Sequence, residues 1–153
     1  MGFELRINFT DIIQTNSLRN TYFNGVINGF KFDIRLSYYR GLYLSCIDQL
    51  KVSVDHLAIE DEQVLFHLNG KEFTIAQLPY VISEFWAITK PATLEIHQPS
   101  GLAAGLHEIE LTLMLRSPYL PLPGSDEVHA YAPINSCDTA LLELQGGKNH
   151  ESN

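Results

Sequence analysis

The sequence has no apolar run close to the roughly 18 residues that a transmembrane helix needs, and it is poor in cationic residues. Ten Lys and Arg stand against 18 Asp and Glu, which gives a formal net charge of −8. Nucleic acids and anionic membranes both attract basic surfaces, so this charge disfavours either one as a partner. The chain does not open with a basic segment followed by an apolar one. We therefore see no signal peptide and expect a cytoplasmic protein.

Cysteine is also scarce. Cys46 and Cys137 are the only two, and neither is accompanied by the histidine and helix N-terminus that activate a nucleophilic thiol. Because disulfides are rare in the cytoplasm, we expect both to be reduced thiols that are buried as small apolar groups.

The spacings that are typical of metal sites are missing as well. The six histidines lie ten or more residues apart, and no Cys-x-x-Cys motif occurs. Paired carboxylates such as Glu108 and Glu110 fall on the polar side of a predicted strand, where nothing signals the burial that a general acid requires. We therefore expect this chain to contribute no catalytic residue, no metal site and no other cofactor site.

The sequence is rich in alternating segments instead. Apolar residues occupy every second position over residues 30–38, 50–54, 94–96 and 109–115. Such strands with one polar face are typical of antiparallel sheets. About eight strands separated by turns predict an all-β domain over residues 1–145, an antiparallel β-sandwich of the immunoglobulin or fibronectin type. The polar residues 146–153 are predicted to be a disordered tail.

The turn residues refine this prediction. Asn69-Gly70 lies between two alternating runs and predicts a tight hairpin, which would place Phe66 opposite Phe73 and Val64 opposite Ile75. Two further Asn-Gly pairs, at 24–25 and 28–29, are too close together for two tight hairpins, so we expect one broader loop between residues 23 and 30. The only helical candidate, residues 75–86, is limited by its proline to one or two turns.

Two segments exceed what a plain sandwich requires. Residues 38–43 crowd three tyrosines and an arginine around one glycine, and residues 116–124 add three prolines and a tyrosine to the end of the clearest strand. Tyr and Arg are enriched at interface hot spots, so both segments are candidates for contact with a partner. A tyrosine corner plus an irregular strand end explains them equally well. The candidate residues are Tyr38, Tyr39, Arg40, Tyr43, Arg116 and Tyr119.

Several stretches in order along the chain, between roughly residues 11 and 144, resemble the small β subunit of bacterial C-glycoside deglycosidases. The Tyr-Tyr-Arg-Gly and Arg-x-Pro-Tyr-x-Pro blocks are the more specific parts of the resemblance. The stretches are "FDIRLSYYRGLYLSCID", "LNGKEFTIAQL", "KPATLEI", "GLAAGLHEIELTLMLRSPYLP" and "PINSCD".

The resemblance implies a hetero-oligomer. In that family the β-sandwich subunit pairs with an α subunit, a TIM barrel that resembles sugar-phosphate isomerases and holds a divalent metal, typically manganese. The substrate is a C-glycoside of an aromatic aglycone, such as a flavonoid or another polyphenol, already oxidised to a 3-keto sugar. A base removes the acidified C2 proton, the metal stabilises the enolate, and the aglycone carbon leaves from C1 in a lyase reaction.

By this resemblance the present chain is a non-catalytic β subunit that is inactive alone, and its candidate residues form a surface for the α subunit or a border of the substrate pocket. Two alternatives remain open at this point. One is a carbohydrate-binding or protein-interaction module without an enzymatic role, and the other is a free-standing enzyme.

Overall fold

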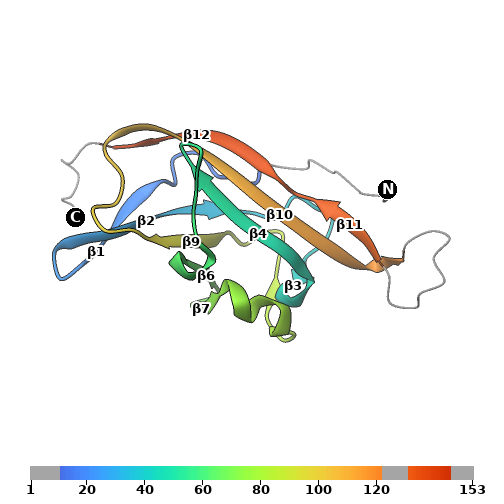
Figure 1. The fold of residues 1–153 in the computed structure, drawn as a ribbon. Coiled ribbons are helices and arrows are strands. Elements are labelled where there is room, and N and C mark those ends of the chain that lie inside the picture. The colour runs from blue at the N-terminus through green and yellow to red at the C-terminus, as the bar shows by residue number, and fades with distance from the viewer. Residues whose placement is uncertain (1–10, 122–130, 146–153) are drawn as a thin grey trace.

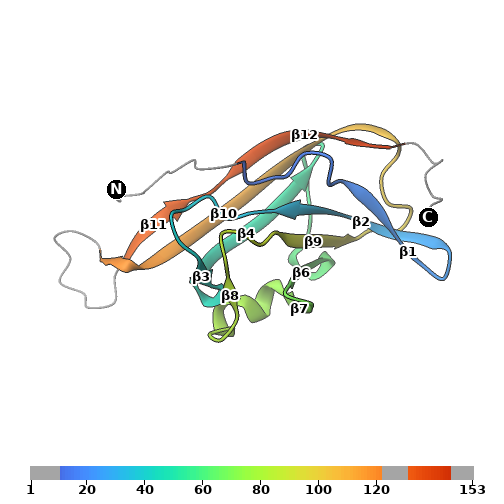
Figure 2. The same cartoon turned by 180° about the vertical axis from the view of Figure 1, so that it is seen from behind.

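The structure is a computed structural model that describes residues 11–121 and 131–145, with side chains described except at 118–121 and 131–132. Two antiparallel sheets face each other with the core between them, which confirms the predicted all-β sandwich (Figures 1 and 2). The first sheet has the strand order β1-β2-β9-β6-β7. Its strands are β1 (Arg19–Phe23), β2 (Val26–Ile34), β9 (Ala92–His97), β6 (Val64–Leu68) and β7 (Lys71–Thr74).

The second sheet is built around one long strand, β10 (Gly105–Pro121). It pairs along one edge with β4 (Ile47–Val54), and β4 pairs in turn with β5 (Leu57–Ala58). Along its other edge β10 pairs first with β12 (Asp138–Leu144) and then with β11 (Tyr131–Asn135). A third, two-stranded sheet joins β3 (Leu42–Tyr43) to β8 (Phe85–Trp86).

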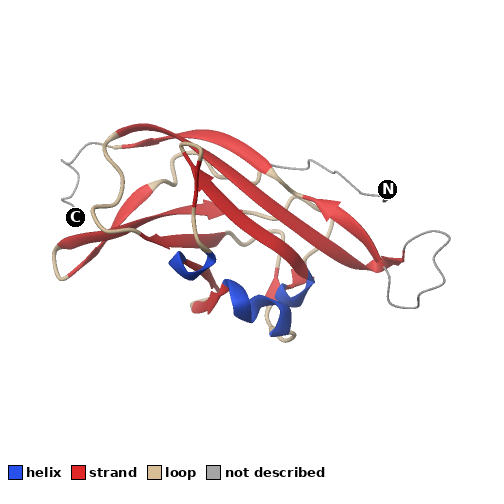
Figure 3. Cartoon of the chain, in the orientation of Figure 1, coloured by secondary structure: helices blue, strands red, loops and turns tan. Residues whose placement is uncertain are grey.

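Three short 3₁₀ turns lie together beside these strands (Figure 3): η1 (Leu44–Cys46), η2 (Asp61–Gln63) and η3 (Ile75–Tyr80). The short helical turn predicted near residue 75 is η3, and it contains Pro79. The other two turns were not predicted. In the part of the chain that the structure describes, no helix has both the length and the apolar character needed to cross a membrane.

The core confirms the alternation. The apolar residues of each alternating segment are buried, and their polar neighbours are half-buried or exposed except for Ser37, which is buried. Burying one Leu, Ile or Phe side chain contributes about 1.5–3 kcal/mol, so the two inner faces supply most of the stabilisation. The buried residues of the predicted segments are Phe30, Phe32, Ile34, Leu36, Tyr38, Leu50, Val52, Val54, Leu94, Ile96, Ile109, Leu111, Leu113 and Leu115.

The hairpin prediction at Asn69-Gly70 is confirmed, and Phe66 lies opposite Phe73. Both turn residues have positive φ, as a type I′ turn requires. The second expected pair is wrong, because the strand ends at Thr74. The Thr74 hydroxyl accepts a hydrogen bond from the Gln77 amide and starts η3, and Val64 pairs with Ile96 of β9 instead.

The broad loop expected between residues 23 and 30 is also wrong. Asn24-Gly25 forms a tight hairpin between β1 and β2, again with positive φ at both residues. Asn28 and Gly29 lie inside β2, where a bulge shifts the register with β1. A Cβ at Gly29 would lie 2.0 Å from the Ile96 carbonyl oxygen, so this glycine permits close strand approach and forms no turn.

Candidate partner-binding surface

The tyrosines of residues 38–43, which follow β2, do not all lie on the surface. Tyr38 is only 2% exposed, and its hydroxyl donates a hydrogen bond of 2.9 Å to the buried Ser117 hydroxyl. Burial raises the pKa of Tyr38. Its assignment to an exposed surface is therefore wrong, since it continues the inward positions of β2. Tyr39 and Arg40 are exposed.

Gly41 holds the next part of this segment against β8. A Cβ at this position would lie 2.5 Å from the Trp86 carbonyl oxygen and 2.6 Å from the Phe85 ring, so only glycine allows the observed approach. Beyond it, Tyr43 lies directly opposite Phe85 in the β3–β8 pair. Their rings meet edge to face with centroids 5.0 Å apart, and both stay largely exposed, Tyr43 at 43%.

A second exposed segment runs alongside the first. The Leu44 amide donates to the Glu84 carbonyl and the Ser45 amide to the Val81 carbonyl, each at 3.0 Å. These bonds fix residues 80–86 beside β3 and η1, and large apolar side chains of this segment point to solvent. We call the combined exposed set the aromatic surface; it comprises Tyr39, Tyr43, Tyr80, Ile82 and Phe85.

Sequence reasoning missed Tyr80, Ile82 and Phe85. These residues lie in the helical candidate predicted over residues 75–86, which its proline limits to one or two turns, whereas Phe85 belongs to the two-residue strand β8. One signal in the sequence pointed to an exposed apolar surface here. Large apolar residues are dense after Pro79, and their spacing does not place them on one face of a helix or a strand.

A buried carboxylate anchors the segment that carries these residues. Glu84 accepts hydrogen bonds from the Asn69 side-chain amide at 2.8 Å and from Lys71 Nζ at 2.9 Å, both in the β6–β7 hairpin. These two bonds hold the pKa of Glu84 below its usual value. Next to it, Trp86 is buried edge to face against Phe66 with centroids 5.3 Å apart.

The remaining candidates, Arg116 and Tyr119, both belong to β10. Arg116 forms an ion pair of 3.0 Å with Asp48 and donates a hydrogen bond of 2.8 Å to the Ser45 carbonyl. It therefore braces η1 from within the chain, although its side chain is partly exposed. Tyr119 lies on β10, and its side chain is outside the described residues, so its role stays a prediction.

The thiols do not form a disulfide. Cys46 is buried in η1, and its burial raises the pKa of the thiol, which disfavours the reactive thiolate. Cys137 is half-buried. The environment of Cys46 does not resemble that of an activated nucleophile.

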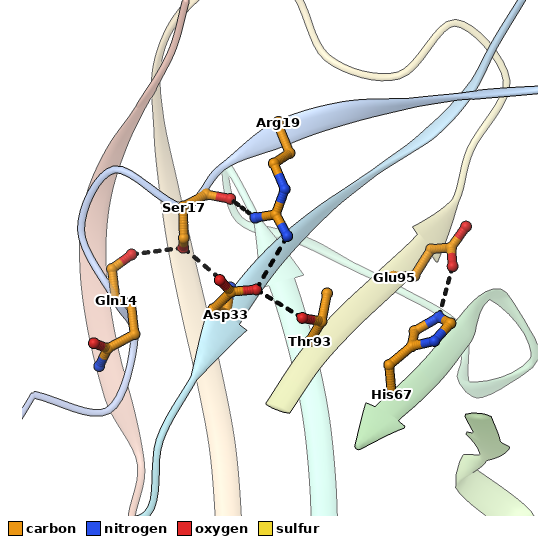
Figure 4. Close-up of polar contacts among 7 residues, drawn as sticks. All are labelled: Gln14, Ser17, Arg19, Asp33, His67, Thr93 and Glu95. Atoms are coloured by element: carbon orange, nitrogen blue, oxygen red, sulfur yellow. Dashed lines mark hydrogen bonds and ion pairs between the residues drawn. The ribbon is translucent and has the colours of Figure 1, made fainter. Parts of the chain in front are cut away.

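The polar outer face of the first sheet is held by internal pairs (Figure 4). Asp33 accepts hydrogen bonds from Arg19 and Thr93, at 3.2 and 2.8 Å, and His67 Nε2 lies 2.7 Å from Glu95 Oε1. His67 is thus half-buried and paired with Glu95. Over residues 11–121 and 131–145 no group of three or more His, Cys, Asp or Glu is arranged to hold a metal ion.

Comparisons with known proteins agree with the resemblance. A family profile described as C-glycoside deglycosidase beta subunit matches residues 9–119. The C-glycoside deglycosidase beta subunit of Eubacterium cellulosolvens is 39% identical over 111 residues, which are 72% of this chain and 76% of the relative. A 3′-dehydrocarminate deglycosidase beta subunit from Microbacterium sp is 36% identical over 99 residues, 63% of this chain and 73% of the relative.

The chain therefore belongs to the C-glycoside deglycosidase beta subunit family. The name of the family implies an alpha subunit as partner. All five residues of the aromatic surface fall inside the matched range.

Proposed function

We propose that this chain is the non-catalytic β subunit of a C-glycoside deglycosidase and that it binds its α subunit through the aromatic surface. The α subunit, a TIM barrel resembling sugar-phosphate isomerases, would hold a divalent metal and the catalytic base. The complex would cleave the carbon–carbon bond between a 3-keto sugar and an aromatic aglycone by enolate formation and elimination.

The observation that carries this proposal is the exposure of the aromatic surface. Tyr80 is 81% exposed and Ile82 is 74% exposed, and both lie on the segment that carries Phe85, the residue opposite Tyr43. Soluble monomers rarely expose several large apolar side chains together unless the patch binds something. Tyr and neighbouring Arg residues are typical anchors of protein interfaces, and Arg40 lies beside Tyr39 at this surface.

The rigidity of the surface supports the same conclusion. Gly41, Glu84 and the edge-to-face ring pair hold both segments in place before any partner binds. A surface ordered in advance loses little conformational entropy on association, so more of the buried apolar area contributes to affinity.

The chemistry of the described residues agrees with the proposed division of labour between the subunits. They offer no metal cluster, and Cys46 is a buried thiol with a raised pKa. On this proposal the metal and the base belong to the α subunit. One relative is named for 3′-dehydrocarminate, which supports an oxidised C-glycoside as the substrate of the complex.

Co-purification tests the proposal. The full chain is produced with a tagged α subunit, and assembly and turnover of a 3-keto C-glycoside are measured for wild type, Tyr43→Ala and Tyr22→Ala. Tyr22 is the matched control, because it is also an exposed tyrosine but lies on β1, away from β3 (Figure 1). We expect Tyr43→Ala to weaken assembly and Tyr22→Ala to behave as wild type.

Two results would count against the proposal. If both variants assembled equally well, the aromatic surface would not be the interface with the α subunit. Deglycosidase turnover by the isolated chain, without any α subunit, would show that the chain carries a catalytic centre of its own.

A further inference from the structure

The connection between β9 and β10 passes from the first sheet to the second at the end of the sandwich away from β3 (Figure 1). We call residues 98–104 of this connection the strap. On the first sheet, Asn20 of β1 fixes it with two hydrogen bonds of 3.0 Å, one from its side-chain amide to the Leu102 carbonyl and one from the Leu102 amide to its side-chain oxygen. This anchor contains no titratable group.

On the second sheet a histidine fixes the strap. His107 Nδ1 lies 2.7 Å from Asp55 Oδ2, in the turn between β4 and β5, and its Nε2 lies 2.7 Å from the Ala103 carbonyl oxygen. A carboxylate and a carbonyl can only accept hydrogen bonds, so both ring nitrogens must donate. Only the imidazolium carries two N–H groups, and a neutral ring leaves one of the two contacts without a proton.

The surroundings of His107 favour this charged form. Its side chain is only 12% exposed, and burial alone would disfavour protonation. The hydrogen bonds to Asp55 and Ala103 outweigh that effect and raise the pKa of His107 above 6.5. The same contact lowers the pKa of Asp55, which also accepts a hydrogen bond of 2.9 Å from the Glu108 amide.

Other charged groups near this site are paired with one another. His56 follows Asp55 in the turn, and its Nε2 lies 3.1 Å from Glu108 Oε1, with Glu110 at 4.0 Å from its other nitrogen. On β12 the residue opposite His107 is the neutral Leu142, and the first sheet contributes the neutral Asn20. Asp55 is thus the charged partner that His107 contacts directly.

We propose that His107 is a pH-sensitive clasp, which as an imidazolium fastens the strap to the β4–β5 turn and on deprotonation releases one of these two contacts. A histidine with a raised folded pKa contributes its full stabilisation below its unfolded pKa, near 6.5, and loses it as pH rises through the folded value. The clasp therefore loosens on the alkaline side. The strap stays attached to β1 through Asn20, so the change is confined to this end of the sandwich and does not involve the aromatic surface.

Nuclear magnetic resonance of the ¹⁵N-labelled full chain, between about pH 5.5 and 9.5, tests the proposal. Imidazole spectra should show both nitrogens of His107 protonated at about pH 6.5, with a titration midpoint above that value. The backbone amide of Ala104 should shift with the same midpoint, because it belongs to the same peptide group as the Ala103 carbonyl that His107 contacts. A ring with one protonated nitrogen at about pH 6.5, or an Ala104 amide that does not follow His107, overturns the clasp.

Two variants separate the clasp from a general effect of charge. Asp55→Asn keeps a residue that tolerates the positive φ of the turn but removes the carboxylate. The titration midpoint of His107 should therefore fall, and the midpoint of the Ala104 amide shift should fall with it. Asp61→Asn removes a more distant carboxylate, paired with Lys51, and should leave both unchanged. Equal midpoints in wild type and Asp55→Asn, or a shift of the same size in Asp61→Asn, would contradict the proposal.

Discussion

Tyr43 and Phe85 face each other across the two-stranded sheet β3–β8, with ring centroids 5.0 Å apart and ring planes inclined at 71°. This pair joins two segments that are more than forty positions apart in the sequence, and both rings remain available to a partner. It therefore has two roles that can be measured separately, one in stability and one in assembly.

The first prediction concerns the stability role. Edge-to-face aromatic pairs contribute about 0.5–1.5 kcal/mol beyond their buried area. A double-mutant cycle with Tyr43→Ala, Phe85→Ala and the double variant, followed by chemical denaturation, should give a coupling energy in that range. Strict additivity of the two single variants would show that the rings do not interact in solution.

The second prediction concerns Arg40 as an interface anchor. Truncating a buried interfacial Arg costs about 2 kcal/mol or more, which corresponds to roughly thirty-fold in affinity. Arg40→Ala should leave the circular dichroism spectrum unchanged but weaken α subunit binding by about that factor. The control is Lys31→Ala, which removes a cation on β2 in the first sheet. Tyr119→Ala is expected to weaken assembly in the same assay.

The outcomes for Arg40 are distinct. Normal assembly and normal turnover would exclude Arg40 as an anchor. Normal assembly with lost turnover would mean that the segment borders the substrate pocket, and the chain would then contribute more directly to catalysis than proposed.

The third prediction concerns Gly41. A Cβ placed there meets the Trp86 carbonyl oxygen at 2.5 Å, and backbone cannot move aside cheaply. Gly41→Ala should lower the stability by about 1–3 kcal/mol, as overpacking does elsewhere, and should weaken assembly because it displaces Phe85. Arg40→Ala, at the adjacent exposed position, is the control for stability. Equal melting temperatures for the two variants would show that the loop relaxes without cost.

The sequence predicted the inner face of the sandwich because period-two alternation directly reports which side of a strand is buried. Leu113 and Ile34 lie inside as expected. The same pattern also placed Tyr38 inside, but the composition of its neighbours led to the opposite assignment. For this residue the periodicity was the better guide.

The rest of the surface depends on contacts between distant segments, which a local pattern does not report. β8 is two residues long and is a strand only because β3 lies beside it. The β6–β7 hairpin buries Glu84 against Asn69 and Lys71, two residues that are more than ten positions away in the sequence. Gly29 was predicted to lie in a loop for a similar reason. The group that requires a glycine there is the Ile96 carbonyl on β9, which is distant in the sequence.

The last prediction concerns Glu84 and acid. Because its folded pKa lies below the ordinary value of 4.5, its stabilising contribution is fully present above 4.5 and is lost as pH falls through the folded value. Denaturation can be followed by the fluorescence of Trp86, which is the only tryptophan and lies two positions after Glu84. At neutral pH the wild type should be more stable than Glu84→Gln. The difference should stay constant down to about pH 4.5 and then shrink.

Glu72→Gln removes an exposed carboxylate from β7 in the same hairpin and should differ little from wild type at any pH. If the gap between wild type and Glu84→Gln widened in acid, or if Glu72→Gln reproduced it, the buried carboxylate would not be the anchor of the segment that carries Tyr80, Ile82 and Phe85.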